Sequence, residues 1–367
     1  MVTGFSIERL EIPPTLDGPG GADFREGVAV RNASEVRAYG TAEVEYSAEE
    51  LFPNWHDEHA PKVLWVARVD GRIVGRAIHE TQLRTAAEVG WLDVDVHPLF
   101  EQRGIGRALA ETVEQHARGL GESRLLTYVV SSTHSADNTD TDALPERRLV
   151  PPTGYGSVPS DNREVRFLLA RGYRLEQVER ASRLALPADP LGDGGLRQDA
   201  RAAASAEYDV HLWRGATLER WLGDVALMLT RMSTDAPTAG LDEPEDVWTV
   251  ERLADHERRE NDGPRVTFTA AVEHRATGRL VAFNQLAVPL DTSRPVGQQD
   301  TLVLREHRGH RPGTLVKLAN LDHLQSEAPG HPSILTWNAE ENRFMLRVNE
   351  AMGFVPIGYE GAWRLDL

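Results

Sequence analysis

Short apolar segments in the first half of the chain predict a series of strands. Apolar and polar residues alternate over residues 5–10, which predicts a strand. Residues 62–81 have the pattern of two strands joined at Asp70-Gly71, a dipeptide that favours a tight hairpin. Residues 89–96 give a further strand, and residues 124–130 form a continuous apolar run. The order predicts a small sheet with one hairpin near its start.

Between these strands lie segments whose apolar residues have helical spacing. We expect helices over residues 24–40, from the glycine-containing turn near residue 104 to about residue 120, and over residues 163–170, where Gly172 ends the pattern. Ser47 and Glu50 have the spacing of a capping box at the start of a short helix. Helices therefore alternate with strands.

The same plan recurs about 205 residues later in the chain. The second copy comprises a strand at 208–213, a helix at 218–232, a helix from about Val250, strands at 265–273 and 279–288, a strand, loop and helix over 300–321, a strand at 334–337 and a closing helix before Gly353. A repeat of one multi-element order predicts two similar domains.

The composition between the copies marks the expected boundary. Residues 188–207 are rich in Gly, Ala and Asp and have few residues to bury, so we interpret them as a linker. The expected domains are residues 1–187 and 208–367, and a length of 367 residues suits two domains. Polar stretches at 131–163 and 233–246 are predicted loops, and the first is too long for an ordinary connection.

Charge and cysteine content narrow the function. A formal net charge of −17 argues against a nucleic-acid partner, which requires clustered basic residues, and only Lys62 and Lys317 are lysine. The chain has no cysteine, so thiol chemistry and disulfides are excluded. No apolar run suits a membrane span and no signal peptide is evident at the N-terminus, so we expect a cytoplasmic monomer or homodimer.

The segment from Val94 to Leu109 has the pattern of an anion site. A strand leads into a turn with Gly104 and Gly106, and a helix follows. Free backbone N–H groups at a helix start, such as that of Ile105, converge on an anion, and glycine lets a phosphate come close.

This strand, turn and helix resemble the signature of the GNAT superfamily of acyl-CoA-dependent N-acyltransferases. The family's Q/R-x-x-G-x-G/A turn holds the coenzyme A pyrophosphate, and the preceding strand binds the pantetheine arm, here at Val94 and Val96. The family's first Gln or Arg falls on Glu101, so the resemblance implies that Arg103 and Arg107 supply the positive charge. It implies an α/β (α+β) chain of two tandem folds, each a mixed, mostly antiparallel sheet flanked by helices.

The second copy departs further from this signature. With Gly106 aligned on Gly313, Arg311 replaces Gly104, and Pro312 has no N–H to donate. The residues implied to hold the cofactor here are Val303, Arg308, Gly309, His310, Gly313 and, in the closing helix, Asn342, where the family commonly uses an asparagine. The first loop is the better predicted cofactor site.

Acyl transfer to an amine needs a group that removes a proton from the ammonium. Glu88, Asp93 and Asp300 are the main candidates, with Asp95 as a further one, and Asp93 and Asp300 occupy equivalent positions in the two copies. The family's acid tyrosine is replaced by Leu168 and Asn349, so Tyr155 and Tyr359 are the remaining speculative acids.

The histidine pairs His56/His59 and His307/His310 have no further ligand at convincing spacing, so we expect no metal.

Tandem chains of this plan resemble actinobacterial double-GNAT acetyltransferases with the mycothiol synthase architecture. The resemblance implies acetyl-CoA as co-substrate and a small amine-bearing acceptor, attacked directly in a ternary complex. Two alternatives stay open: a catalytically silent acyl-CoA-binding protein and an aminoacyl-tRNA-dependent ligase. The intact Gly104 turn and the acidic charge disfavour the ligase.

Overall fold

A computed structural model describes residues 4–81, 89–131, 147–189, 207–235 and 237–367, together with residues 195, 200 and 202. Within these ranges, no helix combines the length and apolar character that crossing a membrane would require.

The chain divides into two compact units whose borders differ from the predicted ones. The first unit comprises Met1–Glu179, Thr238–Glu243 and Gly358–Leu367, and the second comprises Arg180–Pro237 and Pro244–Ile357. The border thus falls before the predicted linker, most of which lies outside the described residues. Two segments from the second half of the sequence belong to the first unit.

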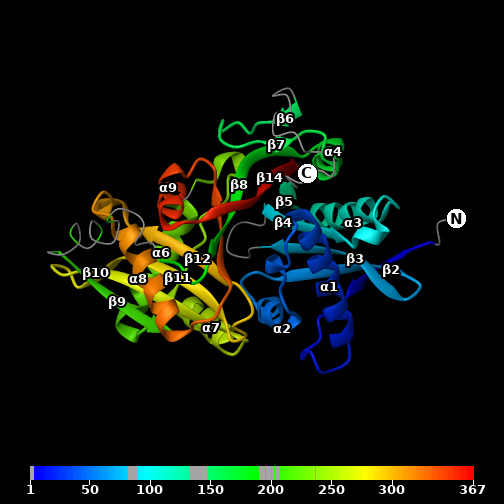
Figure 1. Ribbon diagram of the computed structural model, residues 1–367. Coiled ribbons are helices and arrows are strands. Elements are labelled where there is room, and N and C mark those ends of the chain that lie inside the picture. The colour runs from blue at the N-terminus through cyan, green and yellow to red at the C-terminus, as the bar shows by residue number, and fades with distance from the viewer. Residues whose placement is uncertain are drawn as a thin grey trace. The chain divides into compact units, whose positions relative to one another are not determined.

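The first unit is a sheet with helices on both faces (Figure 1). Its strands are β1 (Ser6–Leu10), β2 (Lys62–Val69), β3 (Arg72–Thr81), β4 (Val89–Val96), β5 (Arg124–Ser131) and parts of β8 (Arg174–Ala185) and β14 (Val355–Asp366). Its helices are α1 (Gly21–Tyr39), α2 (Ala48–Leu51), α3 (Ile105–Leu120) and α4 (Arg163–Ala170), and a small ribbon pairs β6 (Arg148–Leu149) with β7 (Val158–Pro159). The predicted capping box at Ser47 and Glu50 is present.

The strand order in this unit is β1-β2-β3-β4-β5-β14-β8. Only β4 and β5 are recorded as a parallel pair, and β14 pairs antiparallel with β5 from Tyr359 opposite Ser131 to Asp366 opposite Arg124. The end of the chain therefore completes the sheet of the first unit. The sequence repeat predicted most of these elements but neither the last strand nor the unit that it joins, because strand partners are set by tertiary packing.

The second unit repeats this arrangement. Its strands follow the order β8-β13-β12-β11-β10-β9, and β12 and β13 are the parallel pair. They are β9 (Tyr208–Arg214), β10 (Arg265–His274), β11 (Arg279–Pro289), β12 (Val296–Val303) and β13 (Ser333–Ala339), and the helices are α6 (Leu222–Asp235), α7 (Val250–Asn261), α8 (Pro312–Glu327) and α9 (Arg343–Met352). The predicted fold class, mixed and mostly antiparallel β-sheet flanked by helices, is confirmed, although the strands of both units belong to one sheet rather than to two.

Alternating side chains bury both faces of the sheet in each unit. In the first unit Trp65 and Ala67 pack in the cluster under α3, whereas Leu64 and Val66 pack with α1. In the second unit α8 covers the face of Ala270, and α6 and α7 cover that of Ala271. Each β4-like strand therefore lies between two helical layers.

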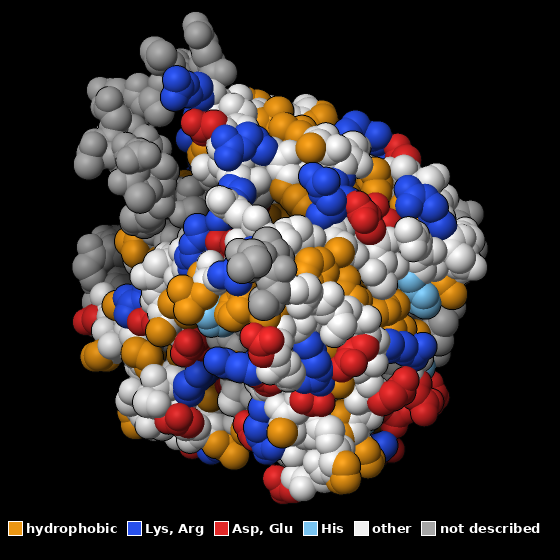
Figure 2. Space-filling model, turned by 90° about the vertical axis from the view of Figure 1, so that its right-hand side faces the viewer, with side chains coloured by type: hydrophobic (Ala, Val, Ile, Leu, Met, Phe, Trp, Pro, Cys, Tyr) orange, Lys and Arg blue, Asp and Glu red, His pale blue; other side chains and the backbone are white. Residues whose placement is uncertain are grey.

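Surface charge is mixed rather than segregated on the face shown in Figure 2, where Lys and Arg side chains lie among Asp and Glu.

Candidate acyl-CoA site

The loop before α3 has an unusual backbone that is suited to an anion. Gln102 and Gly104 both have left-handed conformations, with φ of 59° and 85°, and the residue between them does not. Helix α3 begins directly after Gly104 without a side-chain cap, so its first N–H groups have no partner within the helix. These N–H donors and the positive end of the helix dipole point in the same direction, toward the position that a bound anion would occupy.

The second loop adopts the same backbone with a different sequence. Gly309 and Arg311 have φ of 92° and 59°, at the positions of Gln102 and Gly104, and α8 also begins without a side-chain cap. Each loop thus has one glycine and one strained residue at its two left-handed positions. A left-handed arginine costs about 1–2 kcal/mol, so its presence indicates that this loop geometry is retained against strain.

Both parallel strand pairs separate toward these loops. Strand β4 pairs with β5 only from Val89 to Trp91, and β12 pairs with β13 only at Val296 and Gly297. Beyond these points the strand edges facing β5 and β13 have no recorded partner strand. The edges include the predicted backbone positions Val94, Val96 and Val303.

The glycines after the two loops lie close to these edges. A Cβ at Gly106 would be 3.4 Å from Val96 Cγ2, and one at Gly313 would be 3.3 Å from Val303 Cγ2. A side chain at either position would therefore fill the space between the helix start and the strand. The two sites share this close approach.

Arginines lie around the first loop. Glu101 accepts hydrogen bonds from Arg37 of α1 at 2.5 Å and Arg163 of α4 at 2.6 Å, so its negative charge is balanced. Arg103 donates to the Leu99 carbonyl, and its guanidinium lies over the Phe100 ring. Arg107, in the first turn of α3, makes no ion pair with the described residues, so it is the cation best placed for a phosphate.

The predicted residues of the second loop have partners of their own. Arg308 donates to Asp235 at 2.8 Å and to the Val303 carbonyl at 3.1 Å. The Tyr208 hydroxyl lies 3.0 Å from His307 Nδ1, and its ring lies 6.3 Å from that of His310. Asn342 caps α9, since its side-chain oxygen accepts from the Met345 N–H.

The carboxylate Asp93 lies on the α1-covered face of β4 and is paired. Arg76 of β3 donates to Asp93 at 3.1 Å and to Asp95 at 2.8 Å. Loss of hydration and repulsion by Asp95 raise the pKa of Asp93 to about 6, although its side chain is half exposed. Burial, with repulsion by these carboxylates, also raises the pKa of Glu35 on α1 to about 8.

Asp300 occupies a different local structure from Asp93. Asn284 of β11 pairs with Thr301 of β12, but Leu286 pairs with Gln298, so β12 has an extra residue at Gln299 and Asp300. Among the described residues Asp300 has no hydrogen bond or ion pair, and burial alone raises the pKa of its carboxyl to about 6. The third predicted base, Glu88, lies outside the described residues.

The side chains at the family's acid position cannot donate a proton to a thiolate. Leu168 is buried and apolar, and Asn349 is buried with its amide donating to Asn338 at 2.7 Å. Tyr155, one of the two speculative acids, is 46% exposed. Tyr359 packs at the edge of the cluster under α3.

Sequence reasoning missed the segment Thr238–Glu243, which packs on the first unit's sheet. Leu241 is fully buried against Val89, Leu126 and Ala362, and the Tyr128 hydroxyl donates to Glu243. Trp91 stacks on Tyr128 at 5.7 Å beside this contact. A single apolar Leu241 in a polar loop was the only sequence signal.

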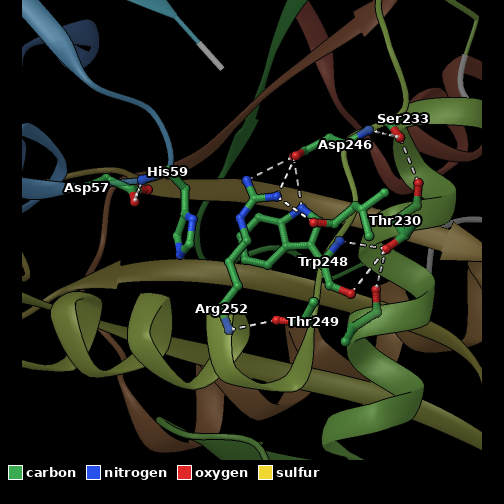
Figure 3. Close-up of polar contacts among 10 residues, drawn as sticks. Asp57, His59, Thr230, Ser233, Asp246, Trp248, Thr249 and Arg252 are labelled. Atoms are coloured by element: carbon green, nitrogen blue, oxygen red, sulfur yellow. Dashed lines mark hydrogen bonds and ion pairs between the residues drawn. The ribbon is translucent and has the colours of Figure 1, made fainter. Parts of the chain in front are cut away.

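The remainder of this loop is fastened to α6 and α7 (Figure 3). Arg252 binds both oxygens of Asp246, at 2.5 and 3.1 Å, and stacks over the Trp248 ring. The Trp248 N–H donates to Thr230, and the Asp246 N–H donates to Ser233. These bonds hold the last turns of α6 in place.

No group of three or more histidine or acidic side chains is arranged to hold a metal ion in the described part of the chain.

Comparisons with known proteins agree with this geometry. Residues 29–146 match the model of the acetyltransferase (GNAT) family. No curated protein matches the chain in sequence. Among solved structures, a tandem GNAT protein from the clavulanic acid biosynthesis pathway is similar, with 24% identity, a TM-score of 0.72, and coverage of 99% of this chain and 98% of that chain.

Two further structures have the fold at lower identity. A GCN5-related N-acetyltransferase from Sphaerobacter thermophilus has 17% identity and a TM-score of 0.58, and covers 99% of this chain and 95% of that one. Saccharomyces cerevisiae N-myristoyltransferase with bound myristoyl-CoA has 10% identity and a TM-score of 0.55, and covers 100% of this chain and 79% of that one. These likenesses show the fold. Residues 29–146 thus match the acetyltransferase (GNAT) family, and the chain as a whole has the fold of the tandem GNAT structure.

Proposed function

We propose that this protein transfers an acetyl group from acetyl-CoA to a primary amine of a small molecule, by direct attack in a ternary complex. The observation that supports it most is the repeated site: a parallel strand pair that separates toward a loop with two left-handed residues and an uncapped helix start. Helix N-termini of this kind bind the pyrophosphate, and an open strand edge offers backbone partners to the pantetheine amides.

The second unit is the proposed site of amine chemistry. Only a neutral amine attacks a thioester, so a base must first remove a proton from the ammonium. Asp300 suits this role because it has no partner among the described residues and a pKa of about 6, which leaves it ionised at pH 7 yet close enough to accept a proton. Backbone N–H groups at the β12 irregularity are candidates to stabilise the oxyanion.

The first unit is the proposed holder of acetyl-CoA without turnover. Its loop retains Gly104 and Arg107, but Asp93 is engaged by Arg76. The segment Thr238–Glu243 also covers Trp91, where β4 and β5 begin to separate. These contacts favour the silent acyl-CoA-binding alternative for this unit alone.

The test replaces each carboxylate separately. We expect Asp300→Asn to lower kcat/KM for a reactive amine by about 10²–10⁴-fold, with the KM for acetyl-CoA nearly unchanged. Asp93→Asn is the matched control and should change kcat/KM by less than about threefold. In the wild type, log kcat/KM should fall as the pH drops through about 6, since protonated Asp300 accepts no proton.

The opposite ranking of the two variants would place the chemistry in the first unit. Acetyl-CoA binding without transfer to any amine would leave only the alternative of a catalytically silent acyl-CoA-binding protein.

A further inference from the structure

A cavity of about 410 Å³ opens between the end of α6 and the residues that follow β12. Leu227 and Leu304 form its apolar part, and Arg231, Asp235 and Arg305 are among its charged lining. All of these residues belong to the second unit, the one that contains Asp300. No step proposed so far uses this cavity.

The charges around the cavity leave one arginine available. Asp235 is 6% exposed and binds both Arg305, at 2.9 Å, and Arg308, at 2.8 Å. Arg231 has no hydrogen bond or ion pair from its guanidinium to the described residues. The lining thus holds two arginines and two carboxylates, Asp235 and Glu306, but Asp235 is also paired with Arg308 from outside the lining, so Arg231 is the arginine left to bind an anion.

The helix that carries Arg231 is held rigidly on both sides of it. Thr230 and Ser233 accept hydrogen bonds from the Trp248 and Asp246 N–H groups, at 2.8 and 2.9 Å (Figure 3). A binding group on a fixed helix loses less freedom when it orders a ligand.

Asp300 lies on the side of β12 that leads to this cavity. Leu302 packs in the cluster of α6 and α7, whereas the Thr301 hydroxyl accepts from Asn284, which bonds Asn320 of α8. Gln299 and Asp300 are the two residues of the β12 irregularity that lie opposite Gln285 of β11, and Gln285 lies by alternation on the same face as Phe283, in the cluster of α6 and α7. Leu304, in the cavity wall, is four positions along the chain from Asp300, which is roughly 13 Å of extended backbone.

We propose that Arg231 anchors a carboxylate of the acceptor while the acceptor's amine lies at Asp300, so that the substrate is an amino acid-like molecule with its amine and carboxylate well separated. This inference rests on the proposed acetyl transfer in the second unit. An arginine guanidinium matches a carboxylate with two parallel hydrogen bonds, and Leu227 and Leu304 provide apolar contact for the intervening carbons.

The experiment uses straight-chain ω-amino acids of increasing length, each matched with the n-alkylamine of the same length. Acetyl transfer is followed by release of free coenzyme A, and binding is measured by calorimetry without acetyl-CoA. We expect a length optimum at which the ω-amino acid has a KM about 10–100-fold below that of its alkylamine. Arg231→Gln should remove this difference and the calorimetric signal, with kcat changed less than about threefold. Arg347→Gln, at an exposed arginine of α9, is the control.

Each other outcome overturns the inference or separates it from the proposed function. Equal KM values for both series in the wild type would overturn the anchor and leave acetyl transfer intact. An increase in the KM for acetyl-CoA in Arg231→Gln, with amine KM values unchanged, would reassign the cavity to the co-substrate. Calorimetric binding that depends on Arg231, without transfer to any amine, would support the anchor and reject the proposed function.

Discussion

At the scale of single residues, the carboxylates at equivalent positions of β4 and β12 have different hydrogen-bond partners. Asp93 shares Arg76 with Asp95, whereas Asp300 lies at an irregularity of β12 without a partner among the described residues. The sequence aligned these aspartates, but their environments depend on an arginine one strand away and on one extra residue in β12. Equivalent positions in a repeat therefore need not have equivalent chemistry.

Lys317 is a second residue whose environment the sequence did not reveal. It is 3% exposed on the buried side of α8, donates one hydrogen bond of 2.9 Å to Gln298, and lies 5.5 Å from the centre of the Phe354 ring. Burial lowers the pKa of its amine from 10.5 to about 7. Such a shift corresponds to roughly 5 kcal/mol of unfavourable free energy when the amine is charged.

We expect Lys317→Met to stabilise the protein by about 2 kcal/mol at pH 7, because the lost bond to Gln298 offsets part of that gain. The unfolded chain binds the lysine proton up to about pH 10.5, but the folded chain releases it near pH 7. Wild-type stability therefore rises across this window, and the advantage of the variant shrinks. Denaturant unfolding from pH 7 to pH 10 measures both effects.

Lys62→Met is the control for this measurement, since Lys62 forms an ion pair with Glu80 at 3.0 Å. An advantage of Lys317→Met that stays constant with pH would contradict a titrating amine at position 317.

At the scale of elements, the loops before α3 and α8 have the same backbone conformation, but glycine occupies a different one of the two left-handed positions in each loop. Gly104 and Arg311 share a left-handed conformation, as do Gln102 and Gly309. The sequence analysis ranked the second loop lower because Arg311 replaces glycine. The structure shows that the path survives this replacement, so the remaining difference is the N–H group that Pro312 lacks.

We expect wild-type protein to bind two molecules of acetyl-CoA, and Gly106→Trp and Gly313→Trp to remove one binding event each. The indole would enter the space beside Val96 or Val303, where even a Cβ lies at 3.4 or 3.3 Å from the valine. Calorimetric titration counts the sites, and the affected Kd should rise more than about tenfold.

Gly119→Trp is the matched control in the same helix as Gly106, because a Cβ there meets nothing within 4 Å. A single site lost with Gly106→Trp alone would show that the second loop does not bind the co-substrate.

At the scale of the whole molecule, the first unit depends on the end of the chain. Trp363 and Leu365 of β14 are 1% and 7% exposed within the core cluster under α3. The strand also pairs with β5 along eight residue positions. The first unit is therefore incomplete until the last residues are synthesised.

We expect deletion of residues 358–367 to abolish hydrogen-exchange protection of β5, because its amides lose their partner strand and its core loses Trp363. In the intact chain, Trp363→Ala should lower the free energy of unfolding by about 3–5 kcal/mol. Val355→Ala, at a 54% exposed position of β14, is the control and should have little effect. Protection of β5 in the truncated chain would indicate that the first unit folds without residues 358–367.

The sequence by itself determined most of the secondary structure, the internal repeat and the position of the candidate anion loop, because these follow from local periodicity, turn residues and the spacing of Gly104 and Gly106. Tertiary structure alone decided which unit receives β14 and Thr238–Glu243, which aspartate is paired, and where Arg231 and Lys317 lie. Those features join residues far apart in the sequence, and the pairing of distant groups is set by packing, which leaves no periodic signal along the chain.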